Sequence, residues 1–546
     1  MSLTVADRFS QILVSFGVRR AYGLPGEDHM PLLAAFETAG ISYHTACNES
    51  SAVIMAATDS AVSGVPGVAV VSMATGVSNG INGLLHAYME GLPVLLLSGR
   101  WPAARESLVV RQGFDPEQLA RPCTKWTTVL RTVGDPAALL CKAVDIATSL
   151  RPGPVYIELP DEIATAECAS ADDALVDELR SRLEAGPSAN GLTALTRAQS
   201  AALAEQLTTA RRPTVVLGGR AKAVRRETLT RFAETFRVPV FTSPAQKGVL
   251  AESCRWFAGA FLNGNPEKEL LEQSDLILAL DPEAFDYLNR AWPRPQDTVA
   301  VSSTPLNEWL FDFGRRLVAA PEGVLLEMLE QASAGASEWT VQEVSRYRSE
   351  VREMLLGKPG ESMSVVEAVD AALRASPTDA CVLADAGFSK PLVTMLSNTT
   401  EPRHFLASNA LSTMGFGIPA ALAASLAGDS PVLAFMGDGS LLMRATELVV
   451  SRHIPRPPIF VAIMDESLSQ IEIKQERGQL AKVGVALPRL SCERIGAAFG
   501  IQGVDVHDVE SLKAAVADAF TGSQCVLIGA HVDGADSRRL FGLLRG

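Results

Sequence analysis

Short apolar runs recur along the chain, and each is separated from the next by a stretch with helical periodicity. In the first third these runs occupy residues 68–72, 94–98 and 155–159, and a shorter one at 21–23 leads into a Leu24-Pro25-Gly26 turn. Apolar strands that alternate with helices are typical of βαβ units, which place the strands in a parallel sheet. The same pattern returns twice more, at 214–217, 238–241 and 276–280, and at 381–384, 432–436, 459–464 and 525–528. The sequence therefore predicts an α/β protein with several parallel sheets.

Two polar segments interrupt this pattern. Residues 185–191 are rich in Ala, Ser and Gly, and a second polar, charge-rich segment runs from 331 to about 362. Stretches of this composition are typical of connections between domains. A chain of 546 residues is expected to hold about three domains. We predict domains at residues 1–170, 190–335 and 363–546.

Composition restricts the partners of the chain. The net charge is −14, and an acidic protein is a poor partner for nucleic acid and for anionic membranes. The 8 cysteines show no Cys-x-x-Cys or Cys/His spacing, so neither a zinc site nor a disulfide framework is expected. No apolar run has membrane-spanning length, and the segment around Asp7 and Arg8 lacks a signal-peptide pattern. We expect a cytoplasmic protein.

One turn carries the clearest chemical signal. Gly437-Asp438-Gly439 follows the apolar run at 432–436, and Asp465 follows the next apolar run, at 459–464. Two carboxylates at the ends of neighbouring parallel strands can hold a hard divalent cation. The flanking glycines allow a backbone to approach a phosphate closely. The pair therefore predicts a site for a metal and a diphosphate cofactor.

The first and third domains look like distant copies of one unit. In the first, Glu49 precedes a helix of small residues, a strand and a polar turn that contains Gly76 and Asn79. In the third, Gly415 precedes a small-residue helix, a strand and the turn around Asp438. Open parallel sheets bind ligands at the carboxyl ends of their strands. Two such sheets facing each other are expected to form a cleft between them.

Several segments, in order, resemble one enzyme family. They lie at residues 22–26, 48–52, 121–125, 411–421 and 437–440. The chain resembles thiamine-diphosphate (ThDP) enzymes of the pyruvate decarboxylase and acetohydroxyacid (acetolactate) synthase superfamily over nearly its whole length. The resemblance implies three doubly wound parallel-sheet domains: a pyrimidine-binding domain, a central Rossmann-like domain and a diphosphate-binding domain. It also implies a homodimer or homotetramer, because relatives bind the cofactor between domains of two subunits.

The same resemblance implies a Mg²⁺ site made of Asp438, Asp465 and the backbone carbonyl of Ser467. Relatives usually have Asn at the position of Asp465, and Asp is also a hard oxygen donor. The alternative is that both aspartates are ordinary turn residues.

Three further residues are expected to act on the cofactor. By resemblance, Glu49 in its protonated form donates to N1′ of the aminopyrimidine and promotes the imino form that deprotonates C2. Met414 props the cofactor in a bent conformation, and the carbonyl of Ser412 accepts from the 4′-amino group. The simpler alternatives are a first-turn Glu favoured by the helix dipole and a Met that belongs to the core.

The remaining candidates surround these residues. Further positions expected at the cofactor are Pro25, Asn79, Gly437, Gly439, Ser440, Leu468 and Ser469. Additional candidate catalytic residues are Glu27, Asp28, His29 and Gln112. Glu27 lies where 2-keto acid decarboxylases place an acidic residue, whereas Asp28 and His29 can equally be exposed turn residues. Candidates for the substrate pocket lie on the helix after the metal loop: Gln470, Ile471 and Lys474.

The implied reaction is the addition of a 2-keto acid to ThDP, loss of CO₂, and release of an aldehyde or capture by a second carbonyl compound. We therefore expect a non-oxidative 2-keto acid decarboxylase or carboligase. Lys474 stands where the synthases carry Trp, which argues against a housekeeping acetohydroxyacid synthase. The alternatives are a 2-hydroxyacyl-CoA lyase or oxalyl-CoA decarboxylase type of enzyme, and a catalytically silent paralogue.

The central domain raises the question of FAD, which synthase relatives bind there. Gly218-Gly219-Arg220 is a glycine turn after a strand, but no Gly-x-Gly-x-x-Gly pattern follows it. A central domain with a purely structural role is the favoured reading, and FAD is the alternative.

Overall fold

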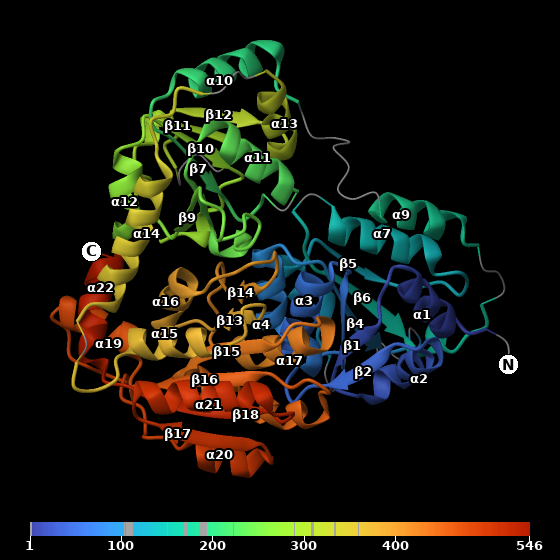
Figure 1. Ribbon diagram of the computed structural model, residues 1–546. Coiled ribbons are helices and arrows are strands. Elements are labelled where there is room, and N and C mark those ends of the chain that lie inside the picture. Colours follow the sequence, from blue (N-terminus) through green and yellow to red (C-terminus); the bar gives the residue numbers. More distant parts are fainter. Residues whose placement is uncertain are drawn as a thin grey trace.

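The computed structural model describes residues 3–102, 104, 113–149, 151–168, 172–184, 194–221, 223–288, 290–306, 311–331, 335–358 and 360–545. Three six-stranded parallel sheets, each with its helices, build the molecule. In Figure 1 the central domain lies above, and the N-terminal and C-terminal domains lie side by side below it. This arrangement confirms the predicted three-domain α/β fold.

The N-terminal sheet has the strand order β2-β1-β3-β4-β6-β5. Its strands are β1 (Arg20–Gly23), β2 (Ser42–Thr45), β3 (Gly67–Val71), β4 (Val94–Arg100), β5 (Trp126–Val129) and β6 (Val155–Pro160). Its helices are α1 (Val5–Ser15), α2 (Met30–Ala39), α3 (Glu49–Ser63), α4 (Thr75–Glu90), α6 (Pro116–Ala120), α7 (Ala137–Thr148), α8 (Asp161–Ala164) and α9 (Ala174–Glu184). Thr4 and Asp7 form a capping box that fixes the start of α1.

The C-terminal sheet has the order β14-β13-β15-β16-β18-β17. Its strands are β13 (Cys381–Ala384), β14 (Phe405–Ala407), β15 (Val432–Gly437), β16 (Ile459–Met464), β17 (Gln502–Val506) and β18 (Val526–His531). Its helices are α15 (Val365–Ala375), α16 (Ser389–Leu396), α17 (Gly417–Ala427), α18 (Asp438–Arg444), α19 (Ser469–Arg477), α20 (Cys492–Phe499), α21 (Val509–Thr521) and α22 (Ser537–Arg545). Counted within its own domain, this order is the same as that of the N-terminal sheet, which confirms the predicted internal copies.

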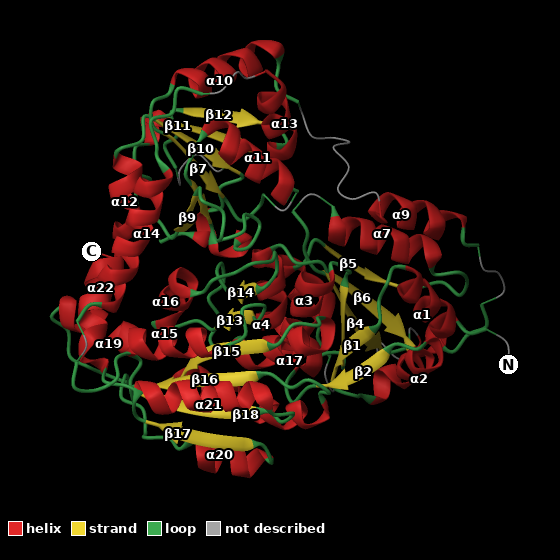
Figure 2. Ribbon diagram, viewed as in Figure 1, coloured by secondary structure: helices red, strands yellow, loops and turns green. Residues whose placement is uncertain are grey.

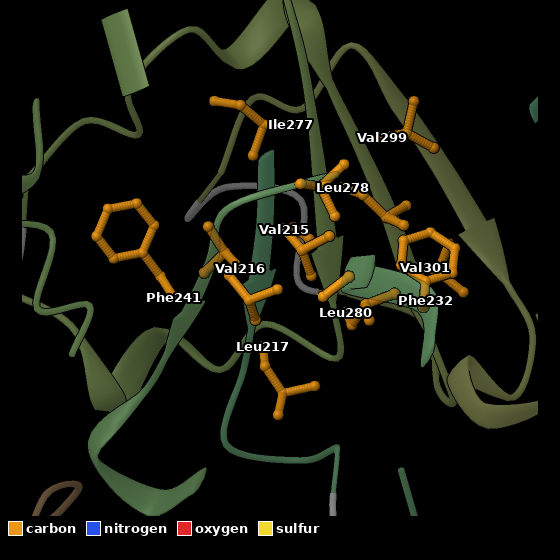
Figure 3. Packing of buried hydrophobic residues seen from close by; sticks show 14 of the residues in the cluster. Val215, Val216, Leu217, Phe232, Phe241, Ile277, Leu278, Leu280, Val299 and Val301 are labelled. Carbon is orange, nitrogen blue, oxygen red and sulfur yellow. The ribbon is translucent and has the colours of Figure 1, made fainter. Parts of the chain in front are cut away.

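The central sheet follows a different order, β12-β11-β10-β7-β8-β9, which corresponds to the 3-2-1-4-5-6 order of Rossmann folds. Its strands are β7 (Pro213–Leu217), β8 (Val240–Thr242), β9 (Phe257–Ala260), β10 (Leu276–Leu280), β11 (Thr298–Ser302) and β12 (Arg315–Val318). Its helices are α10 (Arg197–Thr209), α11 (Arg226–Phe236), α12 (Asn265–Glu272) and α13 (Pro321–Gln331). Figure 3 shows its apolar core, in which residues of β7, β10 and β11 pack with Phe232 and Phe241.

The polar segment predicted between the second and third domains contains a helix, α14 (Val341–Leu356). Thr340 and Glu343 form a capping box at its start. Val344 and Tyr347 pack into the central core, whereas Leu355 packs into the C-terminal core. Figure 1 shows α14 running between the two domains. The segment is therefore a packed connection, because its few apolar residues lie on the faces that meet the two cores.

Small residues join the N-terminal and C-terminal domains. Helix α3 carries Ala52, Ala56 and Ala57, and α17 carries Ala420 and Ala424; all are buried in one cluster that spans both domains. Side chains of this size let two helices approach closely. Figure 2 shows these helices between the two sheets. Among the described residues, no helix is both long and apolar enough to cross a membrane.

Candidate active site

Asp438 and Asp465 lie where the sequence predicts them, at the carboxyl ends of two paired strands. β15 and β16 are parallel neighbours with Gly437 opposite Ile463, Asp438 begins α18 and Asp465 directly follows β16. The backbone N–H groups of Gly439 and Glu466 donate to the Asp438 carboxylate at 2.8 and 2.9 Å. These bonds fix the carboxylate at the mouth of the sheet.

The pKa values of both carboxylates are raised. Burial, together with the charge of Asp465, raises the pKa of Asp438 to about 6. Burial also raises the pKa of Asp465, whose carboxylate accepts from Ser467 N–H at 3.3 Å and from the Ser469 hydroxyl. A divalent cation between two such groups would remove their repulsion. The pair therefore fits the predicted metal.

A metal bound here would need a backbone ligand in addition to side chains. Within the described part of the chain, no three His, Cys, Asp or Glu side chains come together as a metal site. Asp438 and Asp465 supply two carboxylates, so a third protein ligand would be a backbone oxygen, as proposed for Ser467. Glu466 has φ +57°, a left-handed conformation that turns the chain sharply between Asp465 and Ser467.

The glycine turn brings the cofactor motifs together. A Cβ atom at Gly439 would lie 2.8 Å from Leu468 Cδ2 and 3.1 Å from Met414 Cε, so only glycine allows these side chains to meet here. A Cβ atom at Gly437 would meet nothing within 4 Å, which leaves this glycine beside open space. Ser440 is buried and donates to the carbonyl of Ala386 at 3.2 Å. Three motifs predicted at the cofactor thus meet at one point.

The loop before Met414 is held in an unusual conformation. Ser412 has φ +51° and Gly415 has φ +81°, both left-handed. The Ser412 hydroxyl donates to the carbonyl of Asn409 at 3.0 Å and accepts from Lys390 Nζ at 3.3 Å. Lys390 also donates to the carbonyl of Ser408 at 2.9 Å. These bonds fix the direction of the backbone carbonyls around Ser412.

Glu49 begins α3, and Asn48 caps that helix by accepting from Ser50 N–H at 2.9 Å. Asn79 of α4 donates to the Glu49 carboxylate at 2.6 Å, which brings two predicted site residues together. Arg444 of α18 donates to Asn48 at 2.5 Å. No hydrogen bond or ion pair among the described residues joins Glu49 to the side chains at Asp438 or Met414.

The segment after the Pro25-Gly26 turn separates into exposed and buried residues. Glu27 and Pro25 are exposed, and Glu27 makes no hydrogen bond or ion pair within the described residues. Asp28 accepts from Met73 N–H at 2.7 Å and lies 3.2 Å from Nδ1 of the buried His29, whose Nε2 accepts from Gly26 N–H at 3.0 Å. Asp28 and His29 therefore stabilise the turn from inside, and neither is an exposed turn residue.

The substrate candidates on α19 occupy its open side. Ile471 is 45% exposed, Lys474 is exposed and Gln470 is half-buried, whereas Ile473 packs inward. Gln112 lies outside the described residues.

Sequence reasoning missed two residues at this site. Asp385 follows β13, is fully buried, and accepts from the N–H groups of Ala386 and Gly417 at 2.6 and 2.8 Å. Burial raises its pKa to about 7. The rule that selected Asp438 and Asp465, a carboxylate directly after a buried strand, also applies to Asp385. The position of Lys390 beside Ser412 has no comparable signal in the sequence.

The glycine turn of the central domain packs closely against the loop that follows β10. A Cβ atom at Gly218 would lie 2.2 Å from the carbonyl oxygen of Asp281, and one at Gly219 would lie 1.9 Å from Asp286 Oδ2. Arg220 pairs with Glu283 beside them. This close packing requires glycine at both positions and accounts for the turn without a bound cofactor.

Comparison with known proteins agrees with this geometry. Three family models of thiamine pyrophosphate enzymes match this chain. The model of the N-terminal TPP-binding domain matches residues 3–120, that of the central domain matches 200–307, and that of the C-terminal TPP-binding domain matches 385–530. The chain thus belongs to the thiamine pyrophosphate enzymes.

The names of its relatives point to more than one reaction. A probable 2-ketoarginine decarboxylase, AruI, of Pseudomonas aeruginosa is 27% identical over 96% of this chain and 94% of its own length. The large subunit of acetolactate synthase isozyme 3 of Escherichia coli is 25% identical over 98% of this chain and 96% of its own length. An acetolactate synthase of Bacillus subtilis is 23% identical over 98% and 94%. The relatives therefore include a decarboxylase and synthases.

Proposed function

We propose that this chain is a ThDP- and Mg²⁺-dependent, non-oxidative 2-keto acid decarboxylase or carboligase that releases an aldehyde or an acyloin. The observation that carries the proposal is the meeting of Met414, Gly439 and Leu468 beside the Asp438–Asp465 pair. This arrangement offers a support for the cofactor next to a site for its metal and diphosphate. When bound, ThDP supplies the nucleophilic carbon and the electron sink for loss of CO₂.

The residues of the chain hold the cofactor and handle protons. Asp438, Asp465 and the Ser467 carbonyl would hold Mg²⁺, and the carbonyl of Ser412 would orient the 4′-amino group. Glu49 would hold a proton at N1′, with its carboxylate oriented by the hydrogen bond from Asn79.

Glu27 is the candidate for proton transfer to the product. It is an exposed carboxylate in the short 3-10 helix that follows β1, and it makes no hydrogen bond or ion pair within the described residues. A free carboxylate there would also attract a cationic substrate side chain, such as that of 2-ketoarginine. Among the relatives, this feature favours the decarboxylase outcome.

We further infer that the active unit is a homodimer in which two chains share each site. Leu442 and Met443, on the helix that begins at Asp438, are 46% and 58% exposed. Exposed apolar residues next to a candidate site are typical of surfaces that another subunit covers. Within the described part of the chain, Glu49 makes no hydrogen bond or ion pair with its own Met414 loop, and we infer that it serves the partner's cofactor.

A substrate screen tests the proposal. The purified protein is incubated with ThDP, Mg²⁺ and 2-keto acids that include pyruvate and 2-ketoarginine, and CO₂ and products are followed by mass spectrometry. Turnover of at least one keto acid is expected, and Glu49→Gln should lower it by about 100-fold or more. Protein that neither binds ThDP nor consumes any keto acid would refute the function. A Glu49→Gln variant with the wild-type rate would remove only the role of that residue.

A further inference from the structure

A polar cavity lies away from the candidate active site, between the central and C-terminal domains. We name it the α14 cavity; its volume is about 370 Å³, and it is bounded by β9, α14 and the end of α16. β9 is an edge strand of the central sheet, and α14 passes between the two domains. The polar side chains in its lining include Glu252, Ser345, Arg348, Arg352, Ser397 and Asn398.

Arg348 brings a positive charge to this cavity without a carboxylate partner. Its guanidinium donates to the backbone carbonyl of Glu252 at 3.1 Å and lies over the ring of Phe257, 5.1 Å from the centroid. The carboxylate of Glu252 is held by buried Lys247 at 2.5 Å. No carboxylate among the described residues pairs with Arg348. Burial lowers the pKa of Arg348 and the nearby charge of Glu252 offsets this only in part, so an anion in the cavity would stabilise the charged guanidinium.

The second arginine of the cavity is only partly neutralised. Arg352, one helical turn after Arg348 on α14, pairs with Asp370. Asp370 also accepts from Arg374 at 2.9 Å, so one carboxylate serves two guanidinium groups. Cations therefore outnumber carboxylates around the cavity, in a chain whose net charge is −14. This local excess of positive charge favours an anion.

A buried hydroxyl in the lining also lacks a partner. Ser397 is 2% exposed, and its Oγ makes no hydrogen bond among the described residues. The backbone carbonyl of Ser397 accepts a hydrogen bond from Lys247 Nζ at 3.2 Å. This oxygen has almost no accessible surface, so recognition of a ligand in the cavity rests on the arginines.

We propose that the α14 cavity binds a small dianion with carboxylate or phosphate groups, held by Arg348 and Arg352. Guanidinium groups suit both anions because they donate two parallel hydrogen bonds. The two arginines are four residues apart, so they project from the same face of α14.

Helix α16 links this cavity to the cofactor loop. Met395 and Leu396 at its end line the cavity, and Lys390 near its start donates to Ser408 and Ser412. A ligand that fixes the end of α16 therefore favours one position of the loop that precedes Met414. This second part rests on the proposed function, whereas binding of the anion does not.

The test uses holoenzyme saturated with ThDP and Mg²⁺, so that phosphate cannot occupy the cofactor site. Calorimetry measures binding of inorganic phosphate and, separately, of succinate to the wild type, Arg348→Gln and Arg346→Gln. Arg346 is the matched control, because it lies on the same helix, is exposed and pairs with Glu350. Comparing the two anions distinguishes a phosphate from a carboxylate ligand. Melting temperatures without anion establish that the variants fold equally well.

We expect saturable binding of one anion by the wild type and by Arg346→Gln, and affinity at least ~10-fold lower in Arg348→Gln. The site would be overturned if neither anion bound at 10 mM, a dissociation constant that corresponds to a binding free energy of roughly −3 kcal/mol. It would also be overturned if Arg348→Gln and Arg346→Gln bound the anion with equal affinity. The bound anion should also change the half-saturating ThDP concentration in the wild type but not in Arg348→Gln. Binding without that change would overturn only the link through α16, and neither failure bears on the proposed catalytic function.

Discussion

Two glycines on one helix offer a direct test of how α3 and α4 hold Glu49. A Cβ atom at Gly83 would lie 2.6 Å from Val53 Cβ and 2.7 Å from the carbonyl oxygen of Ser50, so Gly83→Ala forces α3 and α4 apart. A Cβ atom at Gly80 would lie 3.7 Å from Val53 Cγ2, an ordinary contact. Both substitutions gain the same helix propensity, about 1 kcal/mol. The difference between the variants therefore isolates the steric cost, about 1–3 kcal/mol.

Urea unfolding followed by circular dichroism measures this difference, with the two variants compared under identical conditions. Gly83→Ala should unfold at lower urea than the wild type, and Gly80→Ala at equal or higher urea. Since α3 begins with Glu49 and α4 carries Asn79, Gly83→Ala should also need more ThDP for half-saturation. Equal stability of the two variants would refute the close packing of α3 on α4.

Two further experiments test the site, and a third tests how a buried histidine affects stability. Glu49→Gln and Asp438→Asn chains should each be inactive, but co-expressed they should recover about a quarter of wild-type activity, because half of the dimers contain one intact site; a mixture without activity would contradict shared sites. Removal of metal with EDTA should abolish wild-type activity and Mg²⁺ should restore it. Binding of ThDP by Asp438→Asn, followed by calorimetry, should need about 10-fold more Mg²⁺ than binding by the wild type; an unchanged requirement would exclude Asp438 as a ligand. Burial lowers the pKa of His86 to about 4. The folded chain therefore binds fewer protons than the unfolded chain between pH 4 and 6.5, and stability falls by up to about 3 kcal/mol as pH drops through this window. His86→Gln should lose this dependence in urea unfolding at pH 5 and 7, and an unchanged slope would assign it to other groups.

Interior strands could be predicted from the sequence, and edge strands could not. β10 and β15 are buried and read as continuous apolar runs, so their positions were predicted closely. β2 (Ser-Tyr-His-Thr) and β12 (Arg-Arg-Leu-Val) lie at sheet edges, are partly exposed and carry polar residues. Their pairing depends on the neighbouring strand rather than on their own pattern. β11 was missed although it is buried, because its apolar part, Val-Ala-Val, is only three residues long.

Candidate site residues could be predicted from the sequence where they follow a strand or begin a helix. They could be predicted less well where the direction of the side chain depends on a contact with another loop. Asp438 and Asp465 were placed correctly relative to each other because strand ends meet at one edge. Asp28 and His29 follow the same turn as Glu27, but the sequence does not show that their side chains point inward. The orientation of Asp28 depends on Met73, which belongs to the next loop along the sheet edge, and that of His29 on its bond with the backbone of Gly26.

The two copies of the common topology carry complementary halves of the site. Glu49 begins α3, and the corresponding helix of the C-terminal copy, α17, begins with Gly417, which has no carboxylate. Asp438 follows β15, whereas the corresponding β3 is followed by Ser72 and Met73. The N-terminal copy thus keeps the acid proposed for the pyrimidine, and the C-terminal copy keeps the carboxylates proposed for the metal. Because neither copy has both groups, a complete site requires two different domains to meet.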